Sequence, residues 1–124
     1  MDPALKEGVR LFNARKFFEA HEALEILWLK TADEEKTFIH GLIQVAAAFH
    51  HFTRGNLAGF RSLLEKSSIK LEKSAEARGG FQLAEFLSQL QPWREWAHRT
   101  AQQRFGTPEG VSSRRLPPLP KIRA

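Results

Sequence analysis

Histidine and glutamate side chains that could do chemistry are concentrated in one short stretch, FFEAHEALEILW, residues 17–28. His21 and Glu25 stand four residues apart and so share one face of a helix, with Glu22 beside them. An imidazole and two carboxylates can form a hydrogen-bonded network, hold a divalent metal ion or act as an acid–base pair. Set among Phe, Leu and Trp, these charged groups need partners, because isolated charges are rarely left inside a core.

A second set of polar residues recurs at helical spacing in FIHGLIQVAAAFHHF, residues 38–52. His40, Gln44 and His51 share one stripe when a helix turns by about 100° per residue. Apolar residues occupy nearly all other sides, which predicts a buried central helix at about residues 34–54. A short loop would set this helix antiparallel to the preceding one. We therefore predict one buried polar cluster between the two helices, made of His21, Glu22, Glu25, Gln44 and His51.

Three interpretations of this cluster are open. A hydrogen-bonded network is favoured, because buried polar groups normally pair with one another. A metal site would use His21, Glu25 and His51, but the chain lacks the Glu-x-x-His pairs of di-iron bundles and the second histidine of the HExxH motif. No cofactor is therefore expected, with a divalent metal as the alternative. Acid–base catalysis on a small ligand is the third interpretation, with candidate catalytic residues His21, Glu22, Glu25 and His51.

Five helices are predicted to carry these residues, over about residues 3–13, 17–30, 34–54, 57–76 and 81–105. Asp2 and Pro3 are typical of a helix cap and a first-turn proline. Gly55 and Asn56 end the third helix and start the fourth. Pro92 leaves two alternatives for the last segment, one helix or two that meet there. Because no strand-like alternation occurs, we predict an all-α fold, a compact bundle of about five helices.

Composition divides the chain near residue 105. Residues 1–105 are expected to form a single helical domain, and residues 106–124 an extended or disordered tail that is basic and rich in proline. This tail could pack on its own body or on a second subunit, or offer PPLP as a polyproline-type ligand. It holds four basic residues and one acid of a chain with net charge +5, which leaves +2 for the body. That distribution argues against a nucleic-acid partner, and binding through the basic tail is kept as an alternative.

Several classes of protein are excluded or disfavoured. The 124 residues include no cysteine, which excludes disulfides, thiolate nucleophiles and cysteine-based metal sites. The longest apolar run, GLIQVAAAF, is far shorter than the roughly 20 residues that cross a bilayer. Since the first ten residues show no export signal either, we expect a cytoplasmic protein with no membrane partner.

Two motifs in order resemble the signature of the domain-of-unknown-function family 309, EAHE.LE..W and GLIQ......H...GN. They are FNARKFFEAHEALEILW and FIHGLIQVAAAFHHFTRGNLAGF, within roughly residues 11–60. The resemblance implies a compact helical bundle and no established activity. This chain departs from the family pattern at His40, where glutamine is frequent, and at His50, where an aromatic or aliphatic residue is usual. The hallmark positions are His21, Glu22, Glu25, Trp28, Gly41, Gln44, His51, Gly55 and Asn56.

These patterns favour a structural or interaction protein that is not an enzyme, with another protein or a second copy in a homodimer as its partner. The first two helices also resemble one tetratricopeptide-type unit. Because its period of about 34 residues is not repeated, we expect no solenoid. A helical groove that binds a peptide is the main alternative among binding modules.

Overall fold

The structure is a computed structural model that describes residues 2–74, 82–102 and 116–123, with the backbone alone at residues 34, 101 and 102. Its five helices are α1 (Pro3–Asn13), α2 (Phe17–Leu29), α3 (Asp33–Thr53), α4 (Leu57–Lys73) and α5 (Leu83–Gln102). No strand occurs in these ranges, and the predicted all-α bundle is confirmed. None of the helices, as far as they are described, is long and apolar enough to span a membrane.

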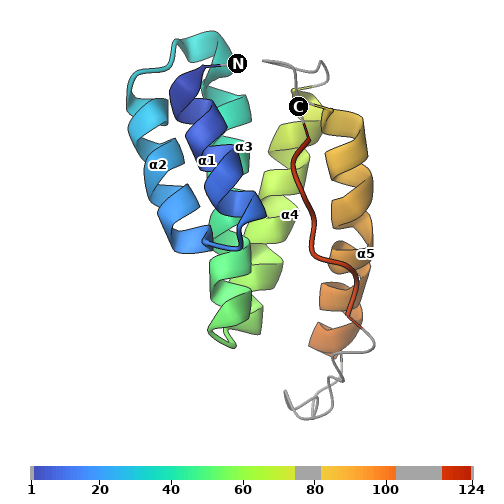
Figure 1. Ribbon diagram of the computed structural model, residues 1–124. Helices are drawn as coiled ribbons and strands as arrows, with labels where there is room; N and C mark the ends of the chain where they lie inside the picture. The colour runs from blue at the N-terminus through green and yellow to red at the C-terminus, as the bar shows by residue number, and fades with distance from the viewer. Residues whose placement is uncertain (1, 75–81, 103–115, 124) are drawn as a thin grey trace.

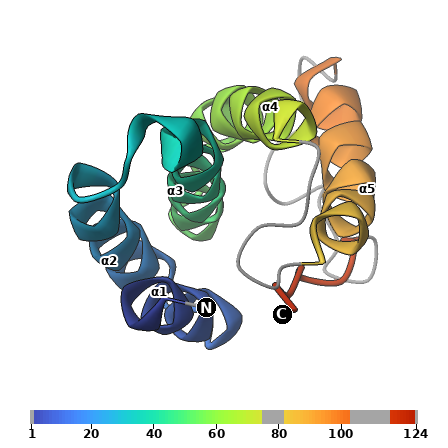
Figure 2. The same ribbon diagram turned by 90° about the horizontal axis from the view of Figure 1, so that it is seen from above.

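The helices follow one another around an arc, so that each packs against the next (Figures 1 and 2). The middle helix, α3, lies between α2 and α4 and is the predicted buried central helix. Its buried residues point to several sides, as the nearly continuous apolar pattern requires. They include Phe38, Leu42, Val45, Ala46 and Phe49.

Phe49 of α3 is the centre of an aromatic core. Its ring centroid lies 6.2 Å from that of Phe12 on α1, 5.2 Å from Phe60 on α4 and 5.2 Å from Trp93 on α5. All three contacts are edge-to-face, the arrangement that aligns the positive edge of one ring with the negative face of another. The Phe49 ring also lies 5.5 Å from that of Phe17 on α2, so one buried side chain joins α3 to all four other helices.

The helix ends follow the predicted local signals. The Asp2 carboxylate accepts hydrogen bonds from the amides of Ala4 and Leu5, at 2.7 and 3.4 Å, and caps α1. Gly55 has a φ of 77°, which glycine adopts without steric cost, and it ends α3. Asn56 then caps α4 by accepting a hydrogen bond from the Gly59 amide at 3.0 Å.

Pro92 lies inside α5, so the segment is one helix and not two. A proline inside a helix costs about 3 kcal/mol, because it removes a hydrogen bond and crowds the preceding turn. Against this, α5 fully buries Phe86, Leu90 and Trp93, and each such side chain contributes about 1.5–3 kcal/mol. Packing therefore outweighs the local preference, and Pro92 itself stays exposed.

The last described segment, residues 116–123, has no helix and runs along α5 toward α1 (Figure 1, red). The Trp93 indole donates a hydrogen bond to the Pro118 carbonyl at 2.9 Å, and Ile122 is buried. Of the alternatives for the tail, packing on its own body is the one seen for these residues. Residues 106–115 and 124 of the predicted tail, residues 75 and 76 of the predicted fourth helix and residues 81 and 103–105 of the predicted fifth helix lie outside the described ranges.

Candidate functional site

A pocket of about 260 Å³ lies between α2 and α3, where the polar cluster was predicted. Polar residues from both helices line it together with apolar ones, and α4 supplies one apolar residue. The lining consists of His21, Glu25, Trp28, His40, Ile43, Gln44, Ala47 and Leu63. The cluster is thus open to a cavity.

Three buried polar atoms of this pocket have no hydrogen-bond partner: Nδ1 of His21, Nε1 of Trp28 and Oε1 of Gln44. They are all the buried side-chain nitrogen or oxygen atoms in that condition among the residues that the structure describes. A buried donor or acceptor without a partner costs about 1–3 kcal/mol, so such atoms are few in natural proteins. The favoured interpretation was a network in which these side chains form hydrogen bonds with one another. The structure corrects it, because these three atoms form no hydrogen bond.

The two carboxylates of the predicted cluster face outward. Nδ1 of His21 lies 3.8 Å from Oε2 of Glu25, beyond hydrogen-bond distance, and the Glu25 side chain is 56% exposed. Glu22 is exposed as well. The prediction that both are buried is therefore wrong, and the reason lies in the packing: α2 is covered by α1 and α3, which leaves its third side to solvent.

His51 lies in a different part of the molecule from the pocket that His21 and Gln44 line. It does not line the pocket, and its Nδ1 lies 3.0 Å from Nδ2 of Asn56. Since Oδ1 of Asn56 accepts from the Gly59 amide, its NH₂ group is the donor to His51, which leaves the proton of a neutral His51 ring on Nε2. His51, Gly55 and Asn56 thus build the turn between α3 and α4, and the predicted cluster divides into two parts.

Trp28 and His40 were not among the predicted cluster residues, yet both line the pocket. The two rings lie 5.8 Å apart, and the Lys36 ammonium sits 4.6 Å from the Trp28 ring centroid. Partial burial, and then the nearby charge of Lys70, lower the pKa of His40, which favours the neutral ring. A sequence signal existed, because Trp28 lies three residues after Glu25 and so on the same side of the helix.

The predicted metal ligands His21, Glu25 and His51 do not come together. In the described parts of the chain, no three or more histidine, aspartate or glutamate side chains are grouped so that they could hold a metal ion. The acid–base alternative paired Glu22 or Glu25 with His51, and these too are separated.

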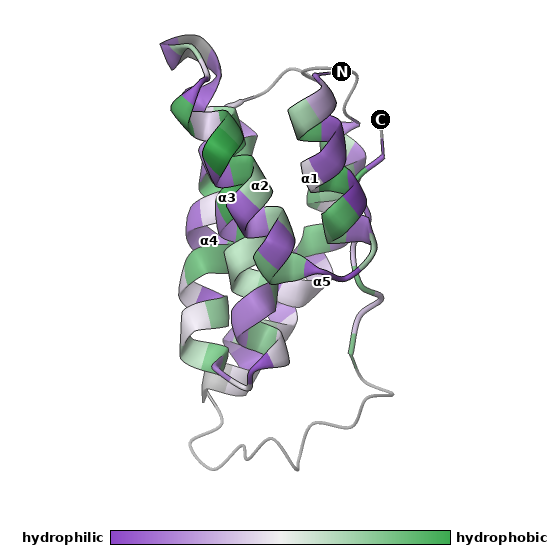
Figure 3. Ribbon diagram, turned by 60° about the vertical axis from the view of Figure 1, so that its left-hand side comes forward, coloured by the Kyte–Doolittle hydropathy of each residue, from purple (hydrophilic) through white to green (hydrophobic). Residues whose placement is uncertain are grey.

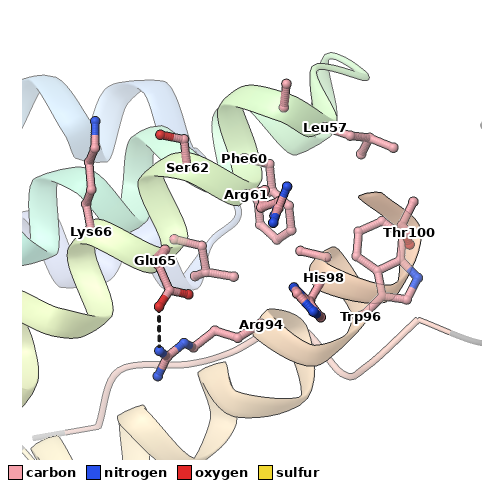
Figure 4. Close-up of a pocket in the computed structure, with 13 residues that line it drawn as sticks. Leu57, Phe60, Arg61, Ser62, Glu65, Lys66, Arg94, Trp96, His98 and Thr100 are labelled. Atoms are coloured by element: carbon pink, nitrogen blue, oxygen red, sulfur yellow. Dashed lines mark hydrogen bonds and ion pairs between the residues drawn. The ribbon is translucent and has the colours of Figure 1, made fainter. Parts of the chain in front are cut away.

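A larger groove, of about 860 Å³, lies between α4 and α5 (Figure 4). Apolar residues such as Phe60 and Trp96 line it, and the Arg94 guanidinium binds Glu65 at 3.0 Å and Glu72 at 2.9 Å. Burial opposes the charge of Arg94, but hydrogen bonds to the two carboxylates raise its pKa. No local sequence signal predicted this groove, because Arg94 and Glu65 are 29 residues apart.

The outer side of α2, together with Lys30 directly after its end, carries an exposed surface that we call the α2 ridge, made of Glu22, Ile26, Leu29 and Lys30. Ile26 is 58% exposed and Leu29 is 70% exposed. Figure 3 brings this side of the molecule forward and shows hydrophobic residues among hydrophilic ones along α2. A shallow hollow of about 250 Å³ adjoins the ridge and shares Glu25 and Trp28 with the α2–α3 pocket.

Part of the sequence is similar to known proteins. Residues 5–63 match the family described as Domain of unknown function (DUF309). An uncharacterized protein of Aquifex aeolicus (strain VF5) is 31% identical over 88 residues, which is 70% of this chain and 26% of the relative. The chain therefore spans about a quarter of the length of that relative. Every residue that lines the α2–α3 pocket falls inside the segment that matches the DUF309 family.

Proposed function

We propose that this chain is a non-catalytic, cytoplasmic interaction domain that pairs with a second copy of itself through the α2 ridge. The observation that carries the proposal is the exposure of Ile26 and Leu29, at 58% and 70%, next to a hollow on the same helix. Large apolar side chains grouped on one face of a surface helix are typical of a docking surface.

The charges on the ridge favour a second copy as the partner. Glu22 lies four residues before Ile26 and Lys30 four residues after it, about one helical turn on each side and on the same face. If two α2 helices pack antiparallel around a two-fold axis at Ile26, each Glu22 faces Lys30 of the second copy. A symmetric interface of this kind contains two equivalent ion pairs between Glu22 and Lys30, one on each side of the axis.

The affinity of this pairing should be modest. Full burial of an Ile or Leu side chain contributes about 1.5–3 kcal/mol, and two copies bring four such side chains. Association itself costs at least about 4 kcal/mol. The balance of about 2–8 kcal/mol corresponds to a weak dimer, with a dissociation constant on the order of 0.1 mM.

Sedimentation velocity over a range of concentrations tests the proposal with the chain itself as the probe. Glu22→Lys and Lys30→Glu should each weaken the dimer, because each places like charges opposite one another. The double variant should restore it, because the charges are exchanged and again complementary. Lys6→Glu, on the exposed side of α1, is the matched control for charge. A wild-type chain that stays monomeric at millimolar concentration would overturn the proposal.

We do not extend the proposal to a metal or acid–base site. His51 is needed in both, and it is hydrogen-bonded to Asn56 at the end of α3.

A further inference from the structure

We infer that the α2–α3 pocket binds a carboxamide group carried on a small apolar or aromatic body. The inference concerns a different surface from the α2 ridge and does not depend on dimerisation. It rests on three features of one place: a cavity of about 260 Å³, three buried polar atoms without partners that belong to its lining, and apolar walls between them.

The unpaired atoms specify a ligand that both accepts and donates hydrogen bonds. Nε1 of Trp28 can only donate, and Oε1 of Gln44 can only accept. A carboxamide supplies an acceptor and a donor, with its carbonyl toward Trp28 and its NH₂ group toward Gln44. The carbonyl has a second lone pair, which can accept from Nδ1 of His21 in the tautomer that carries its proton there, and Oε2 of Glu25 at 3.8 Å favours that tautomer.

Charged groups of similar shape fit less well. A carboxylate has acceptors only, so it would leave Oε1 of Gln44 without a donor and bring a second negative charge near Glu25. An ammonium has donors only, so it would leave the Trp28 indole without an acceptor. It would also approach Lys36, whose ammonium already lies 4.6 Å from the Trp28 ring centroid. The pocket therefore favours a neutral group.

The rest of the pocket sets the size of the ligand body. Ile43, Ala47 and Leu63 are apolar, and the rings of Trp28 and His40 lie 5.8 Å apart. The volume is slightly below the range of about 300–1,000 Å³ that is typical for drug-sized ligands. A body of about one aromatic ring therefore suits this pocket.

Three isosteres separate the head groups in one experiment. We would titrate the full chain at pH 7 with benzamide, benzoate and benzylamine, and follow the indole N–H signal of Trp28 in ¹H–¹⁵N spectra, assigned with Trp28→Phe. Benzamide should shift this signal to saturation. The two charged compounds should bind at least about tenfold more weakly than benzamide. Equal responses to all three would overturn the inference. So would the absence of a saturable benzamide shift, which would mean that water alone fills the pocket.

The variant Gln44→Leu separates binding from folding. It should lose benzamide binding about tenfold or more, yet leave the thermal midpoint of the free chain unchanged or higher, because leucine replaces an acceptor that has no partner. Gln91→Leu, exposed on α5, is the control and should retain binding. Retained binding in Gln44→Leu, or a clear drop in its midpoint, would overturn the inference. Glu22→Lys changes the α2 ridge and not the pocket, so it should keep benzamide binding. Failure of the dimer proposal can therefore be told apart from failure of this inference.

Discussion

Asn13, the last residue of α1, pairs with the backbone of Ile122, which lies 109 residues later in the chain. Its Nδ2 donates to the Ile122 carbonyl at 2.8 Å, and its Oδ1 accepts from the Ile122 amide at 2.8 Å. The side-chain amide thus acts as a short piece of β-strand would. Arg15 supports the same segment by donating to the Pro120 carbonyl at 3.0 Å. The C-terminal segment is therefore held against α1 as well as α5.

Replacing Asn13 by Ala should lower the free energy of unfolding by about 1–3 kcal/mol, because two partly buried backbone groups of Ile122 lose their partner. Asn13→Asp keeps the acceptor for the amide but sets a carboxylate oxygen against the Ile122 carbonyl in place of a donor, so its loss should be at least as large. Urea denaturation measures both, and Gln91→Ala, an exposed amide on α5, is the control. An unchanged midpoint for Asn13→Ala would mean that the segment contributes nothing to stability.

The features of the fold that depend on neighbouring residues could be predicted from the sequence. The Asp2 cap, the glycine at position 55 and the periodicity of α3 act within a few residues, and each was found as expected. The pairing of Asn13 with Ile122 could not be predicted, because nothing near either residue marks the other. Pro92 is a similar case, since its local preference is outweighed by packing that depends on the whole fold.

The candidate site could be predicted in part for the same reason. Helical spacing correctly brought His21 and Gln44 to one interface, because both stripes follow from the period of their own helix. Exposure of Glu22 and Glu25 depends on whether another element covers the third side of α2. The spacing of residues within α2 does not reveal this. His51 shares the stripe of Gln44, but it lies two turns further on, where Asn56 is a nearer partner.

Stability should fall as the pH falls through the range in which His40 titrates. Because burial, together with Lys70, lowers the pKa of His40, the unfolded chain takes up the proton more readily than the folded chain. The contribution is fully present above the unfolded pKa of about 6.5 and is lost as the pH decreases toward the lower folded value. His40→Gln should reduce the slope of unfolding free energy against pH in this range.

Two further measurements check this assignment. Burial also lowers the pKa of His50, so a residual slope should persist in His40→Gln. Lys70→Gln should bring the pKa of His40 closer to its ordinary value, as followed by the histidine ring signals in NMR. A His40 pKa at or above about 6.5 in the wild-type chain would contradict the prediction.

The ion pairs of Arg94 should contribute little stability and should depend on salt. Each joins Arg94 to a carboxylate that is more than half exposed, on Glu65 or Glu72. Pairs of this kind contribute about 0.2–1 kcal/mol, so Arg94→Gln should cost about 1 kcal/mol or less at low ionic strength. A double-mutant cycle with Glu65→Gln, repeated in high salt, measures the coupling. A coupling that does not decrease with salt would show that the pair is shielded from solvent.

Gly8 allows α1 and α2 to approach closely, and Gly8→Ala should destabilise the chain. A Cβ atom at this position would lie 2.6 Å from Cδ2 and 2.8 Å from Cγ of Leu24, which is almost fully buried. Alanine gains about 1 kcal/mol in helix propensity, but overpacking costs about 1–3 kcal/mol, so we expect a net loss of about 1 kcal/mol. In the double variant with Leu24→Ala the clash disappears, and the loss should be smaller than the sum of the two single losses.

Gly55→Ala provides the contrast, because a Cβ there meets no atom within 4 Å and its cost comes from the positive φ of 77°. That cost, about 1–2 kcal/mol, should simply add to the loss from Leu24→Ala. Chemical denaturation of the five variants separates the two origins of a glycine requirement. If Gly8→Ala and Leu24→Ala were also additive, the contact between the helices would have relaxed without strain, and the close approach would not explain Gly8.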